Sequence, residues 1–350
     1  MEVINAELDS LISKNYFNLE YIGYSMFKFM KNGKYGICNS KGDIIANAKY
    51  DYISNFIDGY SIVHIGSQKV ENRKGVLNLK GSEIISPDKN DFIEIRCLKG
   101  NLFACSCIDK KFVTYVYDCS GNLLWACPNG YINSIEGDTS LYEIQKYDEK
   151  QSHFYKGVVN KSGKIIIPIL FDEILLFDTN LYKVKKNIEA LRPEYSGGLW
   201  YENNYKTDIC GLYDALGNLI CDVEFHDIEK VNNTPFYIAR NFSISQYETR
   251  GSLKVHELRP RSILINSVGE IIFEAKDIVV LNDFYLVFVS KGKEGIIDLG
   301  GNIILPPIYD RIGKYEDGKF YVCPYTKYGS RILGNKVKYD EQEDTTVIRL

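Results

Sequence analysis

Residues 157–168 read Gly-Val-Val-Asn-Lys-Ser-Gly-Lys-Ile-Ile-Ile-Pro, and this stretch decides the fold. Two short apolar runs flank Asn160 and Gly163, which stand three residues apart. An Asn side chain caps a tight turn, and a Gly supplies the positive φ that a type I turn with a bulge requires in a hairpin. The stretch therefore predicts two antiparallel β-strands joined by a tight turn.

The same turn pattern, Asn or Asp followed three residues later by Gly, occurs seven times. Recurrence at roughly forty residues indicates one supersecondary unit that is repeated along the chain. A degenerate eighth unit is expected near Gly334. The seven turn glycines are Gly42, Gly81, Gly121, Gly163, Gly217, Gly269 and Gly301.

Each unit predicts four short strands, A to D. Strand A is aromatic-rich, as in residues 181–184, and in five units strand B begins at a glycine six residues before the turn glycine. Strand C is the apolar run after the turn, and strand D follows an aromatic–Asp pair such as Tyr50-Asp51. The 27 Tyr and 17 Phe favour strands over helices.

These patterns predict an all-β repeat protein of about eight four-stranded antiparallel units. Four strands in about forty residues is typical of a β-propeller blade, so we predict a propeller. An open β-solenoid or superhelical array is the alternative, with the altered ends as caps. One β-repeat domain is expected over residues 16–350, and residues 1–15 predict a short amphipathic helix.

Three stretches resemble the bacterial WG-repeat family: residues 34–45, 157–168 and 295–310. Turn, strand and Tyr-Asp signals occur together in them, most fully in residues 295–310. The resemblance covers roughly residues 20–335 and implies a bacterial interaction module without catalytic residues. Where the family has a Trp before the strand B glycine, the chain has Tyr35, Lys74, Lys156, Cys210 and Glu294.

Composition narrows the function classes. A net charge of −4 and a pI of about 5.8 argue against a nucleic-acid binder, which usually shows a basic patch. The first residues lack a secretory signal pattern, and no apolar run reaches the length of a membrane span. Nine Cys, an odd count, fit reduced thiols, so a cytoplasmic protein without membrane contact is expected.

No local motif indicates catalysis, a metal or a cofactor. Cys105 and Cys107 share one face of a strand, but no further ligands accompany them. The four His have no metal-binding spacing, and no phosphate-binding glycine loop occurs. We therefore predict no catalytic residues, no metal and no cofactor.

The strongest functional signal is an interruption of the repeat. The connection between strands A and B is short in most units but long in two consecutive ones, at 186–209 and 241–261. We predict that both are long loops on the same face. They contain Tyr, Trp and Arg, the residues enriched in interface hot spots. The candidate binding residues are Arg192, Tyr195, Trp200, Tyr201, Tyr205, Tyr247, Arg250, His256 and Arg259; Arg261 also lies in the second loop.

The first hypothesis is a non-enzymatic module that binds a protein partner through these loops. By analogy, it could be a bacterial immunity or recognition protein. The second is a hydrolase or lyase whose site lies in a central channel, where catalytic groups converge from several blades. The third is a structural scaffold subunit. Tolerated surface insertions without a partner are the simplest alternative explanation of the two loops.

Overall fold

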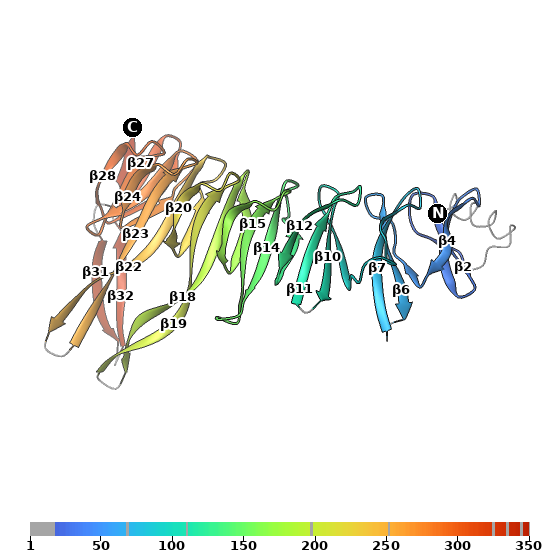
Figure 1. Cartoon of the computed structure of the whole chain (residues 1–350). Helices are drawn as coiled ribbons and strands as arrows, with labels where there is room; N and C mark the ends of the chain where they lie inside the picture. Colours follow the sequence, from blue (N-terminus) through green and yellow to red (C-terminus); the bar gives the residue numbers. More distant parts are fainter. Residues whose placement is uncertain are drawn as a thin grey trace. The chain divides into compact units, whose positions relative to one another are not determined.

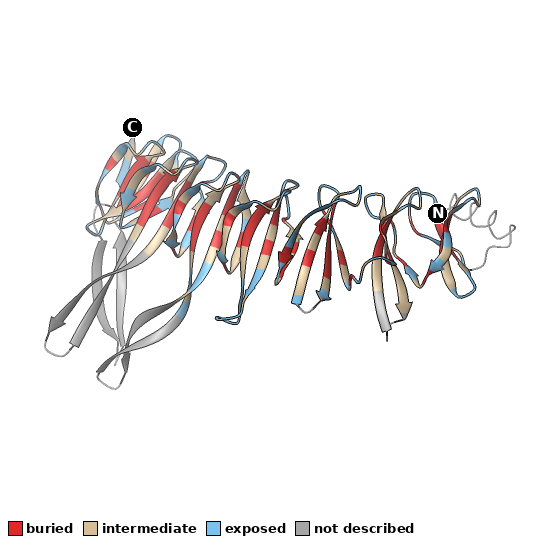
Figure 2. Ribbon diagram, viewed as in Figure 1, coloured by how far each residue is buried: buried red, intermediate tan, exposed pale blue. Residues whose placement is uncertain are grey.

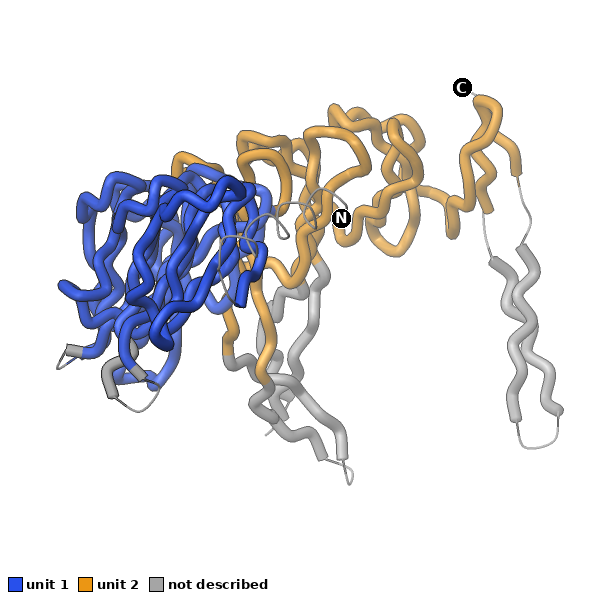
Figure 3. Tube along the Cα trace, turned by 90° about the vertical axis from the view of Figure 1, so that its right-hand side faces the viewer, with its two compact units in different colours: residues 1–176 blue, residues 177–350 orange. Residues whose placement is uncertain are grey.

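A computed structural model describes residues 18–67, 70–109, 111–196, 199–250, 253–323, 326–333, 336–343 and 346–349. It describes the side chains of these residues except within 67–72, 109–110, 189–205, 242–260, 324–345 and 349–350. The predicted helical segment at 1–15 lies outside the described residues. Contacts divide the chain into two compact units, residues 1–176 and 177–350 (Figure 3). The single domain expected over 16–350 stays a prediction.

The first unit contains four antiparallel four-stranded sheets, each built from consecutive strands (Figure 1). The first two sheets are β1 (Glu20–Tyr21), β2 (Met26–Lys31), β3 (Lys34–Asn39) and β4 (Ile44–Tyr50), then β5 (Tyr52–Ile53), β6 (Tyr60–Ser67), β7 (Val70–Asn78) and β8 (Glu83–Ile85). The next two are β9 (Glu94–Leu98), β10 (Leu102–Asp109), β11 (Lys111–Tyr117) and β12 (Leu123–Pro128), then β13 (Gly130–Ser134), β14 (Leu141–Asp148), β15 (His153–Asn160) and β16 (Ile165–Phe171).

The second unit continues the pattern with three more four-stranded sheets. The first is β17 (Glu173–Asp178), which begins before the unit boundary, β18 (Leu181–Ser196), β19 (Leu199–Asp214) and β20 (Leu219–Phe225). The others are β21 (Asp227–Lys230), β22 (Phe236–Arg250), β23 (Leu253–Asn266) and β24 (Ile271–Ala275), then β25 (Asp277–Val280), β26 (Tyr285–Ser290), β27 (Lys293–Asp298) and β28 (Ile303–Tyr309).

The last sheet departs from the expected degenerate unit. It has three strands, because β30 (Lys319–Cys323) lies between β29 (Arg311–Glu316) and β33 (Thr346–Arg349). The strands that follow β30, β31 (Thr326–Leu333) and β32 (Lys336–Glu343), pair with each other in a separate two-stranded sheet. The intervening hairpin therefore occupies the A-to-B connection, and β33 takes the place of strand B.

Each sheet is shifted by one strand from the repeat in the sequence. Strand D of one unit pairs with strand A of the next, as Ile53 on β5 does with Val63 on β6. The chain crosses from one sheet to the next between β4 and β5, at Asp51. Every internal repeat thus contributes strands to two sheets, which couples neighbouring sheets covalently.

The core lies between the faces of successive sheets within each unit (Figure 2). One cluster joins Ile37 and Ala46 to Ile53 and Val63 of the following sheet. The same arrangement joins β18–β20 to β21–β23 through buried residues including Leu212. Inner strands are therefore apolar on both faces: Val158 and Val159, adjacent on β15, are both fully buried.

The turn glycines allow close approach between sheets. Gly81 has a φ of +73°, and a Cβ placed there would lie 2.0 Å from the carbonyl oxygen of Ile45 in the preceding sheet. At Gly121, a Cβ would lie 2.4 Å from the carbonyl oxygen of Ile84. At Gly163 the neighbour is the Trp125 ring, whose Nε1 donates to the carbonyl oxygen of Lys161 at 3.1 Å. The recurring Gly therefore meets both a backbone and a packing requirement.

The strand B glycine has a different steric role. The pairing of β3 with β4 shifts register on both sides of Ile37, so β4 bulges over Gly36. A Cβ at Gly36 would lie 2.6 Å from the Phe29 ring and 2.8 Å from the carbonyl oxygen of Ala46. The absence of a side chain therefore allows the bent strand C to cover strand B.

The prediction of an all-β protein made of repeated four-stranded antiparallel units is confirmed. Among the described residues, no helix occurs and no sheet combines strands from the two ends of the chain. Closure into a propeller stays a prediction.

Replacing Gly81 by Ala tests the packing role of the turn glycines. We expect a loss of about 3 kcal/mol in the free energy of unfolding, since both the positive φ and the Ile45 carbonyl oppose a Cβ. Gly33 is the matched control, because its φ is +74° and nothing lies within 4 Å of a Cβ there. Its Ala variant should lose about 1 kcal/mol in the same denaturant titration. Equal losses would show that the contact with Ile45 is unimportant.

Candidate functional site

The two interruptions of the repeat are β-hairpins, not the long loops predicted at 186–209 and 241–261. β18 and β19 pair from Leu181↔Asp214 to Ser196↔Leu199 without a shift in register. β22 and β23 pair from Phe236↔Asn266 to Arg250↔Leu253, with one irregularity between Ser245 and Tyr247. The prediction of loops was wrong because strands A and B are already antiparallel neighbours. Inserted residues with strand propensity therefore extend the same ladder.

The register places the predicted binding residues along these hairpins. Trp200 lies opposite Tyr195, and Tyr201 lies opposite Glu194, near the turn of the first hairpin. Tyr201 and Tyr205 are four residues apart, so their positions fall on one face of the ribbon, and that of Trp200 falls on the other. The remaining pairs are Arg192↔Asn203, Ala190↔Tyr205, Tyr247↔His256, Ser243↔Arg259 and Arg250↔Leu253.

Neighbouring strands flank the hairpins only at their bases. β20 pairs with β19 over residues 210–213, and β21 pairs with β22 over residues 237–240. β24 pairs with β23 from Ser262 onward. Beyond these points, the described strand pairs show each hairpin as a two-stranded ribbon, whose edges present backbone N–H and C=O groups.

Arg261 fixes the base of the second hairpin. Its Nε lies 3.0 Å from Glu274 Oε1 and its Nη1 lies 3.3 Å from Glu224 Oε1. Its pKa is raised because Glu274 accepts a hydrogen bond from it. Arg261 therefore ties β23 to β24 and β20 at the base of the hairpin.

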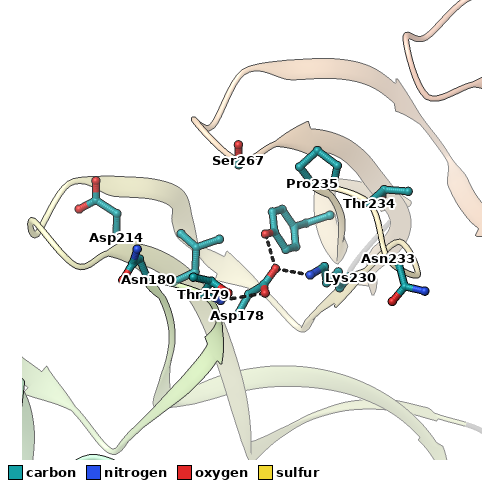
Figure 4. Close-up of a pocket in the computed structure, with 11 residues that line it drawn as sticks. Asp178, Thr179, Asn180, Asp214, Lys230, Asn233, Thr234, Pro235 and Ser267 are labelled. Carbon is teal, nitrogen blue, oxygen red and sulfur yellow. Dashed lines mark hydrogen bonds and ion pairs between the residues drawn. The ribbon is translucent and has the colours of Figure 1, made fainter. Parts of the chain in front are cut away.

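A second candidate site is a pocket of about 450 Å³ in the second unit (Figure 4). The connection between β17 and β18, residues 179–180, forms one side of this turn pocket, and residues 233–235, between β21 and β22, form another. Asp214 and Ser267 line it from the turns that follow β19 and β23. The turn pocket thus lies at the end of the sheets opposite the A-to-B connections.

Asp178 is the central charged group of the turn pocket. Its Oδ2 lies 2.6 Å from Lys230 Nζ and accepts a hydrogen bond from Tyr237 Oη at 2.8 Å. Its Oδ1 accepts one from the backbone N–H of Thr179, also at 2.8 Å. The hydrogen bond from Lys230 is the main reason that the pKa of Asp178 lies below its usual value. Burial and the bond to Asp178 raise the pKa of Tyr237, so its hydroxyl stays protonated.

A similar contact occurs in the first unit without a charged group. Tyr142 occupies the position in β14 that Tyr237 occupies in β22, directly after the first residue of the aromatic segment. Its hydroxyl donates to the backbone carbonyl oxygen of Lys99 at 2.9 Å. A tyrosine that reaches the preceding D-to-A turn is therefore a structural link between sheets. At Tyr237 the acceptor is the Asp178 carboxylate instead of a backbone carbonyl oxygen.

Sequence reasoning missed the turn pocket. Tyr237 belongs to the aromatic strand A signature, but Asp178 lies 59 residues before it and carries no motif. The detectable signal is a difference in turn length, because β21 and β22 are separated by residues 231–235, whereas β17 and β18 are separated only by residues 179–180.

The described residues also bear on metal binding, thiol reactivity and membrane-spanning helices. They contain no group of three His, Cys, Asp or Glu that could hold a metal ion. All nine Cys are free thiols, and burial raises the pKa of both Cys38 and Cys127 to about 11, which disfavours the nucleophilic thiolate. No helix in the described part of the chain has the length and apolarity needed to cross a membrane.

The aromatic–Asp pairs form a recurring corner between sheets. Lys34 Nζ lies 2.6 Å from Asp51 Oδ1, and Lys293 pairs with Asp310 in the same way. At the third corner, His153 Nε2 lies 2.6 Å from Asp172 Oδ1. A basic side chain before or at the start of strand B thus holds the residue at which the chain leaves strand C.

A family model described as "WG containing repeat" matches three stretches, residues 35–67, 157–187 and 295–323. These three stretches are similar to WG-containing repeats. Each matched stretch includes a strand B glycine and the corner Asp that follows it. The resemblance of the sequence to this family is confirmed at these three positions. No curated protein matches the chain significantly.

Solved structures with a similar course of the chain are distant. A crystal structure titled as the eukaryotic initiation factor is 8% identical, with a TM-score of 0.30 over 83% of this chain and 87% of that one. The Pan2 WD40 domain of Neurospora crassa is 8% identical, with a TM-score of 0.24 over 81% and 86%. Pyrococcus horikoshii acylaminoacyl peptidase is 10% identical, with a TM-score of 0.25 over 72% of this chain and 46% of that one. Similarity at this level carries no argument about function.

Replacing Tyr237 by Phe tests the link to Asp178. At pH 7 we expect a loss of about 1.5–3 kcal/mol in the free energy of unfolding, since a hydrogen bond to a charged group is removed. The bond lowers the folded-state pKa of Asp178, so its contribution is present above the unfolded pKa and is lost as pH falls through the folded pKa. The difference between wild type and variant should therefore shrink below about pH 4.

Tyr142→Phe is the matched control, because its acceptor, the Lys99 carbonyl, does not titrate. Its loss of stability should be the same at pH 7 and at about pH 2, well below the usual pKa of an Asp carboxyl. Denaturant titrations at both pH values measure the two differences. A Tyr237→Phe difference that does not change with pH would contradict an ionised Asp178 as the acceptor.

Proposed function

We propose that this chain is a non-enzymatic binding protein that recognises a protein partner through the β18–β19 and β22–β23 hairpins. The observation that carries the proposal is the extension of two adjacent repeats well beyond their sheets. The equivalent strands β26 and β27 pair over only six residues, from Tyr285↔Asp298 to Ser290↔Lys293, whereas β18 and β19 pair over sixteen.

The low stability of such ribbons on their own supports the proposal of a protein partner. A two-stranded ribbon covered by no further strand is only marginally stable in water. Its edges can accept an added strand, which is a common mode of protein recognition. The composition of the hairpins supports the same interpretation, because aromatic and Arg side chains often dominate binding energy. Trp200, Tyr201, Tyr205, Tyr247 and Arg250 are the proposed anchors.

The chain provides a template for removing the hairpins without disturbing the sheets. Lys31 and Lys34 pair across Asn32-Gly33, which have φ values of 52° and 74°, as a tight hairpin turn requires. Lys186↔Ile209 and Asn241↔Arg261 are the corresponding pairs in the two long hairpins. An Asn-Gly turn can therefore replace residues 187–208 and 242–260.

We expect the intact chain to capture a protein from a lysate of its native host and the trimmed variant to lose it. The purified partner should bind the intact chain in a direct titration. Thermal unfolding should show that the trimmed variant keeps its folded sheets. A partner bound equally by both forms, or no protein partner at all, would contradict the proposal.

Single substitutions refine the test. Tyr201→Ala should weaken binding of the captured partner by about 30-fold, since hot-spot residues cost about 2 kcal/mol or more. Tyr147→Ala is the matched control, because Tyr147 is an aromatic residue 39% exposed at the end of β14, outside both hairpins. Its affinity should match that of the wild type. Equal weakening by both substitutions would indicate a contact surface that extends beyond the hairpins.

A further inference from the structure

The turn pocket is an open depression, one wall of which is held by hydrogen bonds. Its longer wall, residues 231–235, is closed by hydrogen bonds from the Val231 N–H to the Phe236 carbonyl oxygen at 2.9 Å and from Thr234 Oγ1 to the Val231 carbonyl oxygen at 2.6 Å. Val231 is fully buried, and Asn232 Nδ2 donates to Asp283 Oδ1 at 2.7 Å. A wall held in this way loses little conformational entropy when a ligand binds.

The charges of the turn pocket are already satisfied within the protein. Lys230 is paired with Asp178 at 2.6 Å, so an anionic ligand would have to compete with that carboxylate. Asp214 accepts hydrogen bonds from the backbone N–H groups of Leu216 and Asn218, at 2.9 and 2.7 Å. The pocket therefore offers no uncompensated charge to attract a phosphate or a carboxylate.

The remaining polar groups suit hydroxyl groups. Asn180, Asn233 and Ser267 line the pocket, and no described residue forms a hydrogen bond with their side chains. Amide and hydroxyl side chains both donate and accept hydrogen bonds, as sugar hydroxyls do. Pro235, which is exposed, adds apolar surface against which the C–H face of a sugar ring can pack.

We infer that the turn pocket binds a neutral polyhydroxylated ligand, a monosaccharide or disaccharide unit. Its volume of about 450 Å³ lies within the usual range of small-molecule sites. Asn180 and Asn233, exposed on two walls of the pocket, supply the hydrogen-bonding groups, and Pro235 supplies the apolar contact. The unit can come from a free sugar or from the end of a glycan, since both present the same hydroxyl groups.

The test is saturation-transfer NMR and calorimetric titration of the full chain. The probes are glucose, galactose, N-acetylglucosamine, maltose and a glycan-bearing glycoprotein, with inorganic phosphate as a charged probe. We expect saturable binding of at least one sugar, with a dissociation constant of about 1 mM or below. Binding of the glycoprotein alone would identify a glycan end as the source. Saturable binding of phosphate alone, or of no probe, would overturn the inference.

Asn180→Gly removes the amide and keeps the turn, because Asn180 has a φ of +59° and Gly adopts this conformation readily. Binding should weaken about tenfold or more. Asn101→Gly is the matched control, since Asn101 has a φ of +58° in the equivalent turn of the β9–β12 sheet and does not line the pocket. Its affinity should equal that of the wild type. Equal weakening in both variants, or none in Asn180→Gly, would overturn the inference.

Sugar binding in the turn pocket does not depend on the proposed protein partner. The variant with both hairpins trimmed retains every pocket residue, because residues 187–208 and 242–260 do not line the pocket. It should bind the sugar with unchanged affinity. Loss of sugar binding on trimming would place the sugar site on the hairpins and overturn its assignment to the turn pocket.

Discussion

The close approach of each turn to the sheet before it constrains the rest of the structure. At Gly81, and again at Gly269 in the second unit, a Cβ would lie 2.0 Å and 2.5 Å from a carbonyl oxygen of the preceding strand C. This approach allows inner strands to bury residues on both faces: Ile263 and Leu264, adjacent on β23, belong to two different core clusters. The repeated Gly therefore sets how closely successive sheets pack, in addition to shaping a hairpin turn.

The shift of one strand between the repeat and the sheet links each sheet to the next one along the chain. Because strand D pairs with the following strand A, no internal repeat can complete its sheet alone. The corner Asp residues reinforce the step: Asp51 accepts hydrogen bonds from both Lys34 and the backbone N–H of Gly66. One carboxylate thus joins strand B of one sheet to strand A of the next, and Lys34 lowers its pKa.

Function is proposed where the repeats differ from one another. At the A-to-B end, added residues extend an existing ladder and create hairpins. At the D-to-A end, unequal turns around Asn180 and Asn233 leave a cavity. The two kinds of variation occur at opposite ends of the strands, so a partner and a small ligand can be recognised independently. The tyrosine link shows the same principle on a smaller scale, because Tyr142 contacts a backbone carbonyl and Tyr237 contacts Asp178.

The sequence by itself determined the repeat type, the turn positions and the WG-repeat resemblance. These features depend on local chemistry, such as the positive φ of a turn glycine and the short apolar runs on either side of it. Sequence also located the interruptions at 186–209 and 241–261, but it misjudged their structure, since their backbone pairing depends on strands A and B already lying side by side.

Only the tertiary structure showed that Gly81 contacts Ile45 of another sheet and that Asp178, Lys230 and Tyr237 meet around one pocket. Gly81 and Ile45, and likewise Asp178 and Tyr237, lie about one repeat apart or more. Nothing in their local spacing records which sheet faces they share. The shift of one strand between repeat and sheet determines that, and it follows from how strands pair in space. Local backbone preferences depend on residues that are neighbours in the sequence, whereas the turn pocket arises from the packing of two turns of unequal length.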